Sequence, residues 1–343
     1  MNRWLRGAAA FIALSYFAGL LVAWALLRFV GEHFWATAVG LYLPRIAFLA
    51  PLPVTVGALA IFGPRKLLWT QLAAVLVVVF PLMGLVLPSP FTHAHAGRAS
   101  VRVLSFNVDS LADGADLVAA AIEAERPDVA LLQEFAGNEP FIERLRKTFT
   151  DVRVSTQFVL ASRFPVTEVT EPPKLPYGDK QRSPRFVRYV LATPLGPIAV
   201  YSVHPISPRW GFYSLRGQGL RREILSGRLF SAARSGQLRE DTGLRVLQVE
   251  TFAAEAARET LPVLIAGDTN LPSLSPALAT NLGAFTDAFT RAGSGFGYTF
   301  PARHPWMRID RMLGSSALEF TSFKVNCAGT SDHLCVVADV ERR

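Results

Sequence analysis

Three long apolar stretches near the amino terminus constrain this chain more than any other feature. Residues 7–27, 46–63 and 67–91 contain no charged side chain and run for 21, 18 and 25 residues. A bilayer core needs about 20 apolar residues per helix, so the first and third stretches are long enough to cross one. The middle stretch contains Pro51 and Pro53, but it can extend back past Arg45, whose long side chain can reach the interface.

Charge at the ends of these stretches predicts their number and orientation. We expect a transmembrane region over residues 1–92 with spans at 7–27, 44–63 and 67–89; two spans with an interfacial segment are the alternative. A cleavable signal peptide would explain only the first stretch. Arg3 and Arg6 precede the first span, and Arg65 and Lys66 separate the last two, which predicts a cytoplasmic amino terminus. Three spans then place the remainder outside the cytoplasm of a bacterial-type cell, as part of a multi-pass membrane protein.

The net charge of +8 needs to be divided between the two parts of the chain. Residues 1–92 hold six basic residues and one acidic residue, whereas the remainder holds 29 basic and 26 acidic residues. Most of the surplus therefore belongs to the membrane region. The remainder is only mildly basic, which weakens an interpretation as a nucleic-acid-binding protein.

After a linker at residues 93–100, residues 101–343 alternate strand-like and helical patterns. Their length suits one domain built around two packed sheets. The predicted strands are residues 101–106, 129–132, 153–160, 186–192, 198–203, 263–266, 312–313 and 334–340, and the helical segments are 116–125, 140–149 and much of 215–260. Cys327 and Cys335 could form a disulfide between adjacent strands outside the cytoplasm, or could be two buried, unpaired thiols.

Polar side chains with catalytic potential follow buried strands six times along this region. They are Asn107 with Asp109, Glu134, His204, Asp268 with Asn270, Asp310, and Asp332 with His333. Any one of them could be a turn or a helix cap. Six in order are hard to assign to turns, because groups at strand ends can converge on one edge of a sheet.

This ordered set resembles the endonuclease/exonuclease/phosphatase family, which includes DNase I-like nucleases, apurinic endonucleases, inositol-phosphate phosphatases and bacterial sphingomyelinases. The resemblance covers residues 101–340 and extends to the segments 161–165 and 297–301. It implies an α/β fold: a four-layer αββα sandwich of two packed mixed sheets, here preceded by about three membrane spans. The combination with an apolar front resembles VanJ-type bacterial membrane proteins, a branch associated with glycopeptide resistance and lipid-carrier pyrophosphate recycling.

Phosphoester hydrolysis gives each polar residue a role, and the resemblance implies the same broad roles. Mg²⁺, or Mn²⁺, would take oxygen ligands: Glu134 first, with Asn107, Asp109 and Asp332 as supporting or alternative ligands. Asp268 would accept a proton from the attacking water or orient it. Asn270, His204 and His333 would donate to phosphoryl oxygens, and Asp310 would orient one histidine.

Other chemistries fit less well. Ser331, Asp332 and His333 are consecutive and cannot form a relay, and the sequence has no G-x-S-x-G elbow, Walker loop or zinc spacing.

The segment after His204 is rich in aromatic and basic residues and suggests a lip beside the site. Arg209 and Trp210 lie in it, and Arg163, Arg182 and Arg185 are further candidate substrate contacts. Rings among acyl chains and guanidinium groups on phosphate would suit a membrane lipid; ordinary surface packing and stacking on single-stranded bases are alternatives.

Tethering by the apolar helices would raise the effective concentration of the site towards lipids. We therefore expect hydrolysis of a lipid phosphate, pyrophosphate or phosphodiester headgroup, with no obligate protein partner. An anchored extracytoplasmic nuclease and a catalytically silent lipid-binding module are the alternatives.

Overall fold

A computed structural model describes residues 3–88, 97–208 and 232–343 of the 343-residue chain. The chain divides into two compact units. One comprises residues 1–87 with 273–276, and the other comprises residues 88–272 with 277–343.

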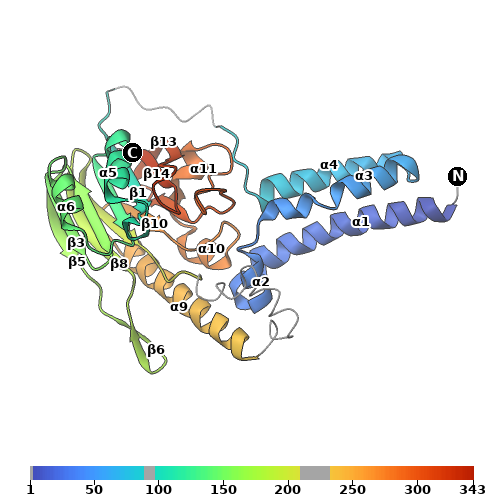
Figure 1. Cartoon of the computed structure of the whole chain (residues 1–343), viewed down its shortest axis with the longest axis horizontal. Coiled ribbons are helices and arrows are strands. Elements are labelled where there is room, and N and C mark those ends of the chain that lie inside the picture. The colour runs from blue at the N-terminus through green and yellow to red at the C-terminus, as the bar shows by residue number, and fades with distance from the viewer. Residues whose placement is uncertain (1–2, 89–96, 209–231) are drawn as a thin grey trace. The chain divides into compact units, whose positions relative to one another are not determined.

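The amino-terminal unit is helical, and its helices α1, α3 and α4 lie side by side (Figure 1). Its elements are α1 (Arg3–Ala25), η1 (Leu26–Val30), η2 (Gly31–His33), α2 (Trp35–Gly40), η3 (Arg45–Leu49), α3 (Leu52–Ile61), η4 (Arg65–Leu67), α4 (Leu68–Val77) and η5 (Val78–Leu82).

The prediction of three full-length spans needs correction. Two helical runs of the described residues are long and apolar enough to cross a membrane, Arg3–His33 with 31 residues and Arg65–Leu82 with 18, and the middle run Arg45–Ile61 is shorter. Pro44 precedes this middle run and Pro64 follows it. Proline lacks a backbone donor and disfavours a helical conformation in the residue before it, so the two prolines limit the length of the run.

The second unit contains two six-stranded sheets. Its elements are β1 (Ser100–Asn107), η6 (Asp109–Leu111), α5 (Ala115–Glu125), β2 (Val129–Gln133), α6 (Glu139–Arg146), β3 (Asp151–Ser155), β4 (Phe158–Ser162), β5 (Val166–Thr170), β6 (Leu175–Tyr177), β7 (Lys180–Arg182), β8 (Phe186–Thr193), β9 (Gly196–Val203), α9 (Ala232–Ala257), β10 (Val263–Asp268), α10 (Pro276–Leu282), β11 (Thr286–Asp287), α11 (Ala288–Ala292), β12 (Asp310–Gly314), β13 (Leu318–Asn326) and β14 (Cys335–Arg342). The strand orders are β13-β14-β1-β2-β4-β3 and β11-β12-β10-β9-β8-β5, and β6 with β7 forms a small separate hairpin. Both large sheets are mixed, because β1 pairs in parallel with β2, β9 pairs in parallel with β10, and their other pairings are antiparallel.

Alternation along each strand produces the layers. Val103 on β1 and Leu264 on β10 belong to a buried cluster between the two sheets, whereas their chain neighbours Leu104 and Ile265 face helices on the outer sides. Helices α5 and α6 cover the first sheet and α9 and α10 cover the second (Figure 1). The expected four-layer sandwich of two mixed sheets is confirmed.

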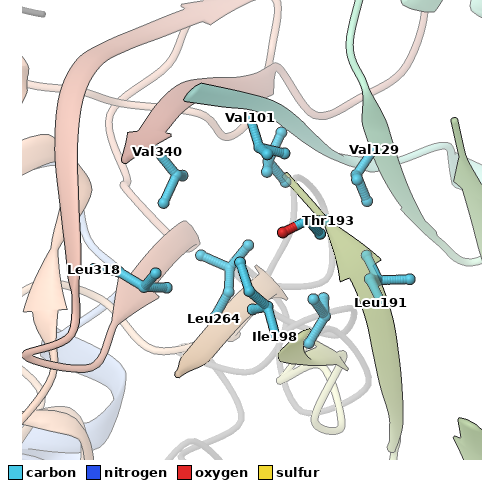
Figure 2. A pocket seen from close by; sticks show the side chains of 10 residues that line it. Val101, Val129, Leu191, Thr193, Ile198, Leu264, Leu318 and Val340 are labelled. Carbon is cyan, nitrogen blue, oxygen red and sulfur yellow. The ribbon is translucent and has the colours of Figure 1, made fainter. Parts of the chain in front are cut away.

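A small apolar cavity of about 10 Å³ remains between the two sheets. Figure 2 shows side chains from both sheets, among them Val101, Val340 and Leu264, pointing into it. Its lining is aliphatic apart from Thr193. A cavity of this size holds at most about one water molecule, so it is a packing gap and no ligand site.

Candidate active site

Strand register brings the predicted catalytic residues to one edge of the sandwich. Asn107 at the end of β1 is level with Gln133 at the end of the parallel strand β2. In the other sheet Asp268 is directly opposite Asp310 on β12. The preceding residue, Gly267, has φ of 151°, and a Cβ atom built on it would lie 2.0 Å from the carbonyl oxygen of Val203. Only glycine fits this close approach of β9 and β10.

One carboxylate oxygen of Asp268 lies at the centre of the site. Its Oδ2 is 3.2 Å from Asn270 Nδ2 and 3.3 Å from Asn107 Nδ2, both of which donate to it. The Nε2 atoms of His204 and His333 lie 3.6 Å and 3.7 Å from the same oxygen. The side chain is 2% exposed, and burial together with the nearby Asp310 carboxylate raises the pKa of Asp268, although the two histidines oppose this. The position expected for the general base is therefore a buried carboxylate surrounded by nitrogen atoms.

Glu134 approaches the same group from the end of β2. Asn107 Nδ2 donates to Glu134 Oε1 at 3.0 Å, and His204 Nε2 is 3.2 Å from that oxygen. Burial works to raise the pKa of Glu134, but the neighbouring His204 and Asn107 lower it to about 2. The backbone amide of Asp109 donates to Asn107 Oδ1 at 3.1 Å, so η6 helps to hold the Asn107 side chain in place.

The second histidine of the site is paired with a carboxylate. His333 Nδ1 lies 2.9 Å from Asp310 Oδ2. Burial opposes the charged imidazolium, but the carboxylates of Asp310 and Asp268 raise the pKa of His333 to about 10. Sequence left open which histidine Asp310 would orient, and the geometry points to His333.

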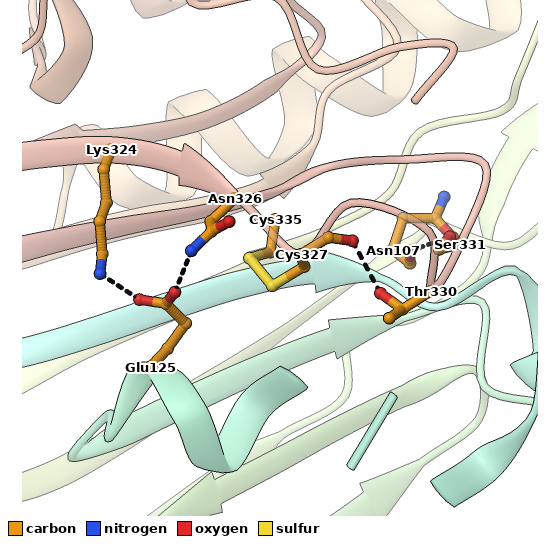
Figure 3. Close-up of a disulfide and its surroundings, with 8 residues drawn as sticks. All are labelled: Asn107, Glu125, Lys324, Asn326, Cys327, Thr330, Ser331 and Cys335. Carbon is orange, nitrogen blue, oxygen red and sulfur yellow. Dashed lines mark hydrogen bonds and ion pairs between the residues drawn. A yellow bond between two sulfur atoms is a disulfide. The ribbon is translucent and has the colours of Figure 1, made fainter. Parts of the chain in front are cut away.

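A disulfide closes the loop that carries His333. Cys327, directly after β13, is bonded to Cys335, the first residue of β14, eight positions further along the sequence (Figure 3). Ser331 Oγ donates to the backbone oxygen of Asn107 at 2.8 Å and accepts from the His333 amide at 3.2 Å. Of the two alternatives for the cysteines, a disulfide or two unpaired thiols, the structure contains the disulfide.

The donor set fits a hard divalent cation. Glu134, His204 and Asp268 present ligand atoms within 4.8 Å of one another, and so do Asp268, Asp310 and His333. Two nearby carboxylates, one of them almost fully buried, need positive charge beside them, and carboxylate oxygens are the ligands that Mg²⁺ and Mn²⁺ prefer. Within the part of the chain that the structure describes, Asp109 and Asp332 belong to neither group.

A sequence model of the endonuclease/exonuclease/phosphatase family matches residues 104–333, which include every residue of this site. The chain belongs to that family. It is accordingly a metal-dependent phosphoric ester hydrolase, the activity that the sequence predicted.

Solved structures with a similar fold are also found. Truncated TDP2 from Caenorhabditis elegans is 18% identical with a TM-score of 0.50, over 71% of this chain and 98% of that chain. SmcL is 14% identical with a TM-score of 0.50, over 71% of this chain and 99% of that chain. An endonuclease/exonuclease/phosphatase from Beutenbergia cavernae is 21% identical with a TM-score of 0.49, over 71% of this chain and 72% of that chain. A search of curated protein sequences gave no match.

Three of the five predicted substrate residues are among those that the structure describes, and they lie in different places. Arg163 follows β4, whose last residue Ser162 is level with the first residue of β2, so it lies at the opposite end of the sheet from Glu134. Arg182 forms an ion pair with Glu240 at 3.4 Å. Arg185 lies beside the site, because its backbone oxygen accepts from the His204 amide at 2.9 Å. Arg209 and Trp210 lie outside the described residues.

One site residue was missed by the sequence analysis. Gln157 Oε1 is 2.9 Å from His204 Nδ1. Residues 153–160 look like a single strand in sequence, whereas the structure has a hairpin there, with Thr156 and Gln157 as its turn between β3 and β4. Thr156 adopts φ of 53° without being glycine or asparagine, so the usual sequence signal of a tight turn is missing.

Proposed function

We propose that this chain is a membrane-anchored, Mg²⁺-dependent hydrolase that acts on a lipid-linked phosphate, pyrophosphate or phosphodiester outside the cytoplasm. The observation that carries the lipid assignment is the pair of long apolar helical runs in the same chain as a phosphoesterase site. The disulfide supports the extracytoplasmic location, because disulfides persist in oxidising compartments and are rare in the cytosol.

Each residue of the site is assigned the task that its side-chain chemistry suits. Glu134 and Asn107 would hold the cation, with Asp109 and Asp332 as further ligands. When bound, the cation supplies charge for the phosphoryl oxygens. Asp268 takes the proton of the attacking water at its carboxylate, and Asn270 orients that carboxylate through its backbone amide and side chain.

The two histidines are assigned to the phosphoryl oxygens. His333, charged through its contact with Asp310, donates to one of them. His204 presents its second ring nitrogen, Nε2, to the same space. Preformed donors of this kind stabilise the charge that develops during the displacement.

A tether favours substrates that reside in the membrane. Two-dimensional confinement raises the local concentration of a lipid headgroup at the site, whereas a soluble polynucleotide gains nothing from it. The surplus of basic residues over acidic residues after position 92 is three in 251 residues, which gives little attraction for a polyanion.

The test offers the purified full chain in detergent four classes of substrate: lipid pyrophosphates, sphingomyelin, phosphatidylinositides and plasmid DNA. Each is measured with Mg²⁺, with Mn²⁺ and with EDTA. We expect one lipid class to be cleaved fastest, and EDTA to abolish cleavage. DNA cleaved as fast as every lipid would overturn the lipid assignment, and full activity in EDTA would overturn the metal assignment.

Two variants separate loss of chemistry from loss of fold. Asp268→Asn should lower kcat by at least about 100-fold, since it removes the proton acceptor, and should leave the thermal midpoint nearly unchanged. Asp113→Asn, at an exposed position on the loop before α5, is the matched control and should retain wild-type kcat. An Asp268→Asn variant that keeps most of its activity would refute the base assignment.

A further inference from the structure

Gln157 sits in a rigid position at the rim of the site. It is the second residue of the two-residue turn between β3 and β4, where Ser155 is level with Phe158. Its backbone oxygen accepts from the amide of Phe135 at 3.0 Å. The turn is therefore tied to the segment that directly follows Glu134, and it cannot shift without moving that segment.

The side chain of Gln157 joins the two sheets at the site. Its Oε1 lies 2.9 Å from Nδ1 of His204, which follows β9 in the other sheet, and 3.4 Å from Arg185 Nη1. A guanidinium group can only donate hydrogen bonds, so the atom that faces it must be the amide oxygen. That oxygen accepts from His204 as well, so Nδ1 carries a hydrogen.

This contact determines which way the His204 ring points. With Nδ1 held by Gln157, Nε2 lies 3.2 Å from Glu134 Oε1 and 3.6 Å from Asp268 Oδ2. The ring is 3% exposed, and Nε2 is buried without a hydrogen bond of good geometry among the described residues. A hydrogen carried on this nitrogen in addition to the one on Nδ1 would point into the site, where a phosphoryl oxygen would accept it.

Arg185 is the second group that Gln157 holds. Burial lowers the pKa of its guanidinium, although the nearby Glu134 opposes this. In the described part of the chain no carboxylate lies within ion-pair distance of it. A cation whose side-chain partner is a neutral amide keeps its charge available for an anion.

We propose that Gln157 is a positioning residue, whose amide oxygen orients His204 and Arg185 together towards the same phosphoryl group of the substrate. The proposal rests on the proposed phosphoesterase function but not on the identity of the lipid. Because glutamine is neutral, it orients Arg185 without cancelling the positive charge that attracts the substrate.

The kinetic test compares Gln157→Leu with Gln157→Glu in the full chain, on whichever phosphoester the wild type cleaves and on bis(p-nitrophenyl) phosphate. Leucine removes the acceptor, and we expect kcat to fall about 10- to 100-fold, as for other residues that orient a catalytic ligand. Glutamate keeps the acceptor but pairs with Arg185, so we expect kcat within a few-fold of wild type and a KM raised about tenfold. Gln181→Leu, at an exposed position on β7, is the control and should change neither constant.

A spectroscopic arm keeps the test independent of substrate. In ¹⁵N-histidine-labelled protein, with His204→Gln used for assignment, the wild type should show a hydrogen fixed on Nδ1 of His204, with or without a second one on Nε2, and Gln157→Leu should lose this preference. A well-folded Gln157→Leu variant with wild-type kcat, KM and tautomer would overturn the proposal, as would Gln157→Glu losing as much kcat as leucine. If the wild type cleaved no phosphoester, the proposed function would fail, while the tautomer measurement would still decide whether Gln157 orients His204.

Discussion

Two carboxylates of the catalytic unit, Asp268 and Asp287, differ in the charge around them. Arg308 and Arg311 both contact Asp287, and although burial opposes it, their positive charges lower the pKa of this carboxyl. Asp268 has amide donors and two histidines that also contact other carboxylates, and the carboxylate of Asp310 lies nearby. The pKa of Asp268 is raised. Asp287 is thus neutralised within the protein, whereas Asp268 retains a demand for a proton or a cation. This difference distinguishes a structural carboxylate from a reactive one.

The structural carboxylate gives a pH-dependent prediction. Asp287 accepts from Arg308 at 2.7 Å and from Arg311 at 3.1 Å, and the Arg311 side chain is fully buried. Asp287→Asn removes the carboxylate that pairs with this buried charge, which should cost about 3–5 kcal/mol of unfolding free energy at pH 7. A carboxyl with a lowered folded pKa stabilises above its unfolded pKa, and the contribution is lost as the pH falls through the folded value.

The difference between wild type and Asp287→Asn should therefore shrink below about pH 4, the ordinary pKa of aspartate. Denaturant unfolding of both proteins between pH 3 and 8 measures it. Asp179→Asn, on the loop between β6 and β7, is the surface control. A difference that stays constant over the whole pH range would show that Asp287 acts through packing and not through charge.

At the scale of elements, the disulfide loop between β13 and β14 is the clearest functional unit. The disulfide joins two residues that are eight positions apart in the sequence. In the chain-entropy view, closing a loop of this length stabilises the fold by about 2–3 kcal/mol. The loop also holds His333 against Asp310 and Ser331 against the backbone of Asn107. Loosening the loop should therefore affect the geometry of the site as well as the stability of the fold.

We predict that reduction of the wild type, or the double variant Cys327→Ser with Cys335→Ser, lowers the thermal midpoint and reduces kcat by about tenfold or more, as loss of an orienting contact does. Activity and differential scanning calorimetry with and without a phosphine reductant measure both effects. The reductant should have no effect on the double variant, which controls for reaction elsewhere. Reduced wild-type protein with unchanged kcat would mean that the hydrogen bonds alone hold the loop.

The strands also show how much of the site could be predicted from the sequence. Strands such as β2 and β10 were recognisable because a buried run is followed at once by a polar residue, and this brought Glu134 and Asp268 into one site. Arg163 was grouped with that site by sequence similarity, but β4 runs antiparallel to β2 and carries it to the far edge. Strand direction depends on long-range pairing, which a local pattern does not contain. Gln157 was missed for a related reason, since its contact with His204 crosses between the two sheets.

For the whole molecule, the number of membrane crossings decides on which side of the membrane the catalytic unit lies. Arg3 and Arg6 favour a cytoplasmic amino terminus, so an odd number of crossings is needed to put the site outside. The two long runs alone would return the chain to the cytoplasm. A disulfide next to the catalytic His333 favours the outside. The side of the membrane on which the catalytic unit lies therefore depends on whether the shorter run Arg45–Ile61 crosses, and a crossing would require a thinned bilayer or help from its flanking residues.

Reporter fusions after Arg343 test this directly. Alkaline phosphatase, which needs disulfides, should be active there, and green fluorescent protein exported in unfolded form should be dark. Inserting two leucines after Ala58 within α3 lengthens the middle run and should leave this pattern unchanged, whereas replacing Val56 and Leu59 by lysine should block the middle crossing and reverse it, because each charge at a span centre costs about 3 kcal/mol. A fluorescent fusion to the wild-type chain would place the catalytic unit in the cytoplasm, where the Cys327–Cys335 bond would not persist.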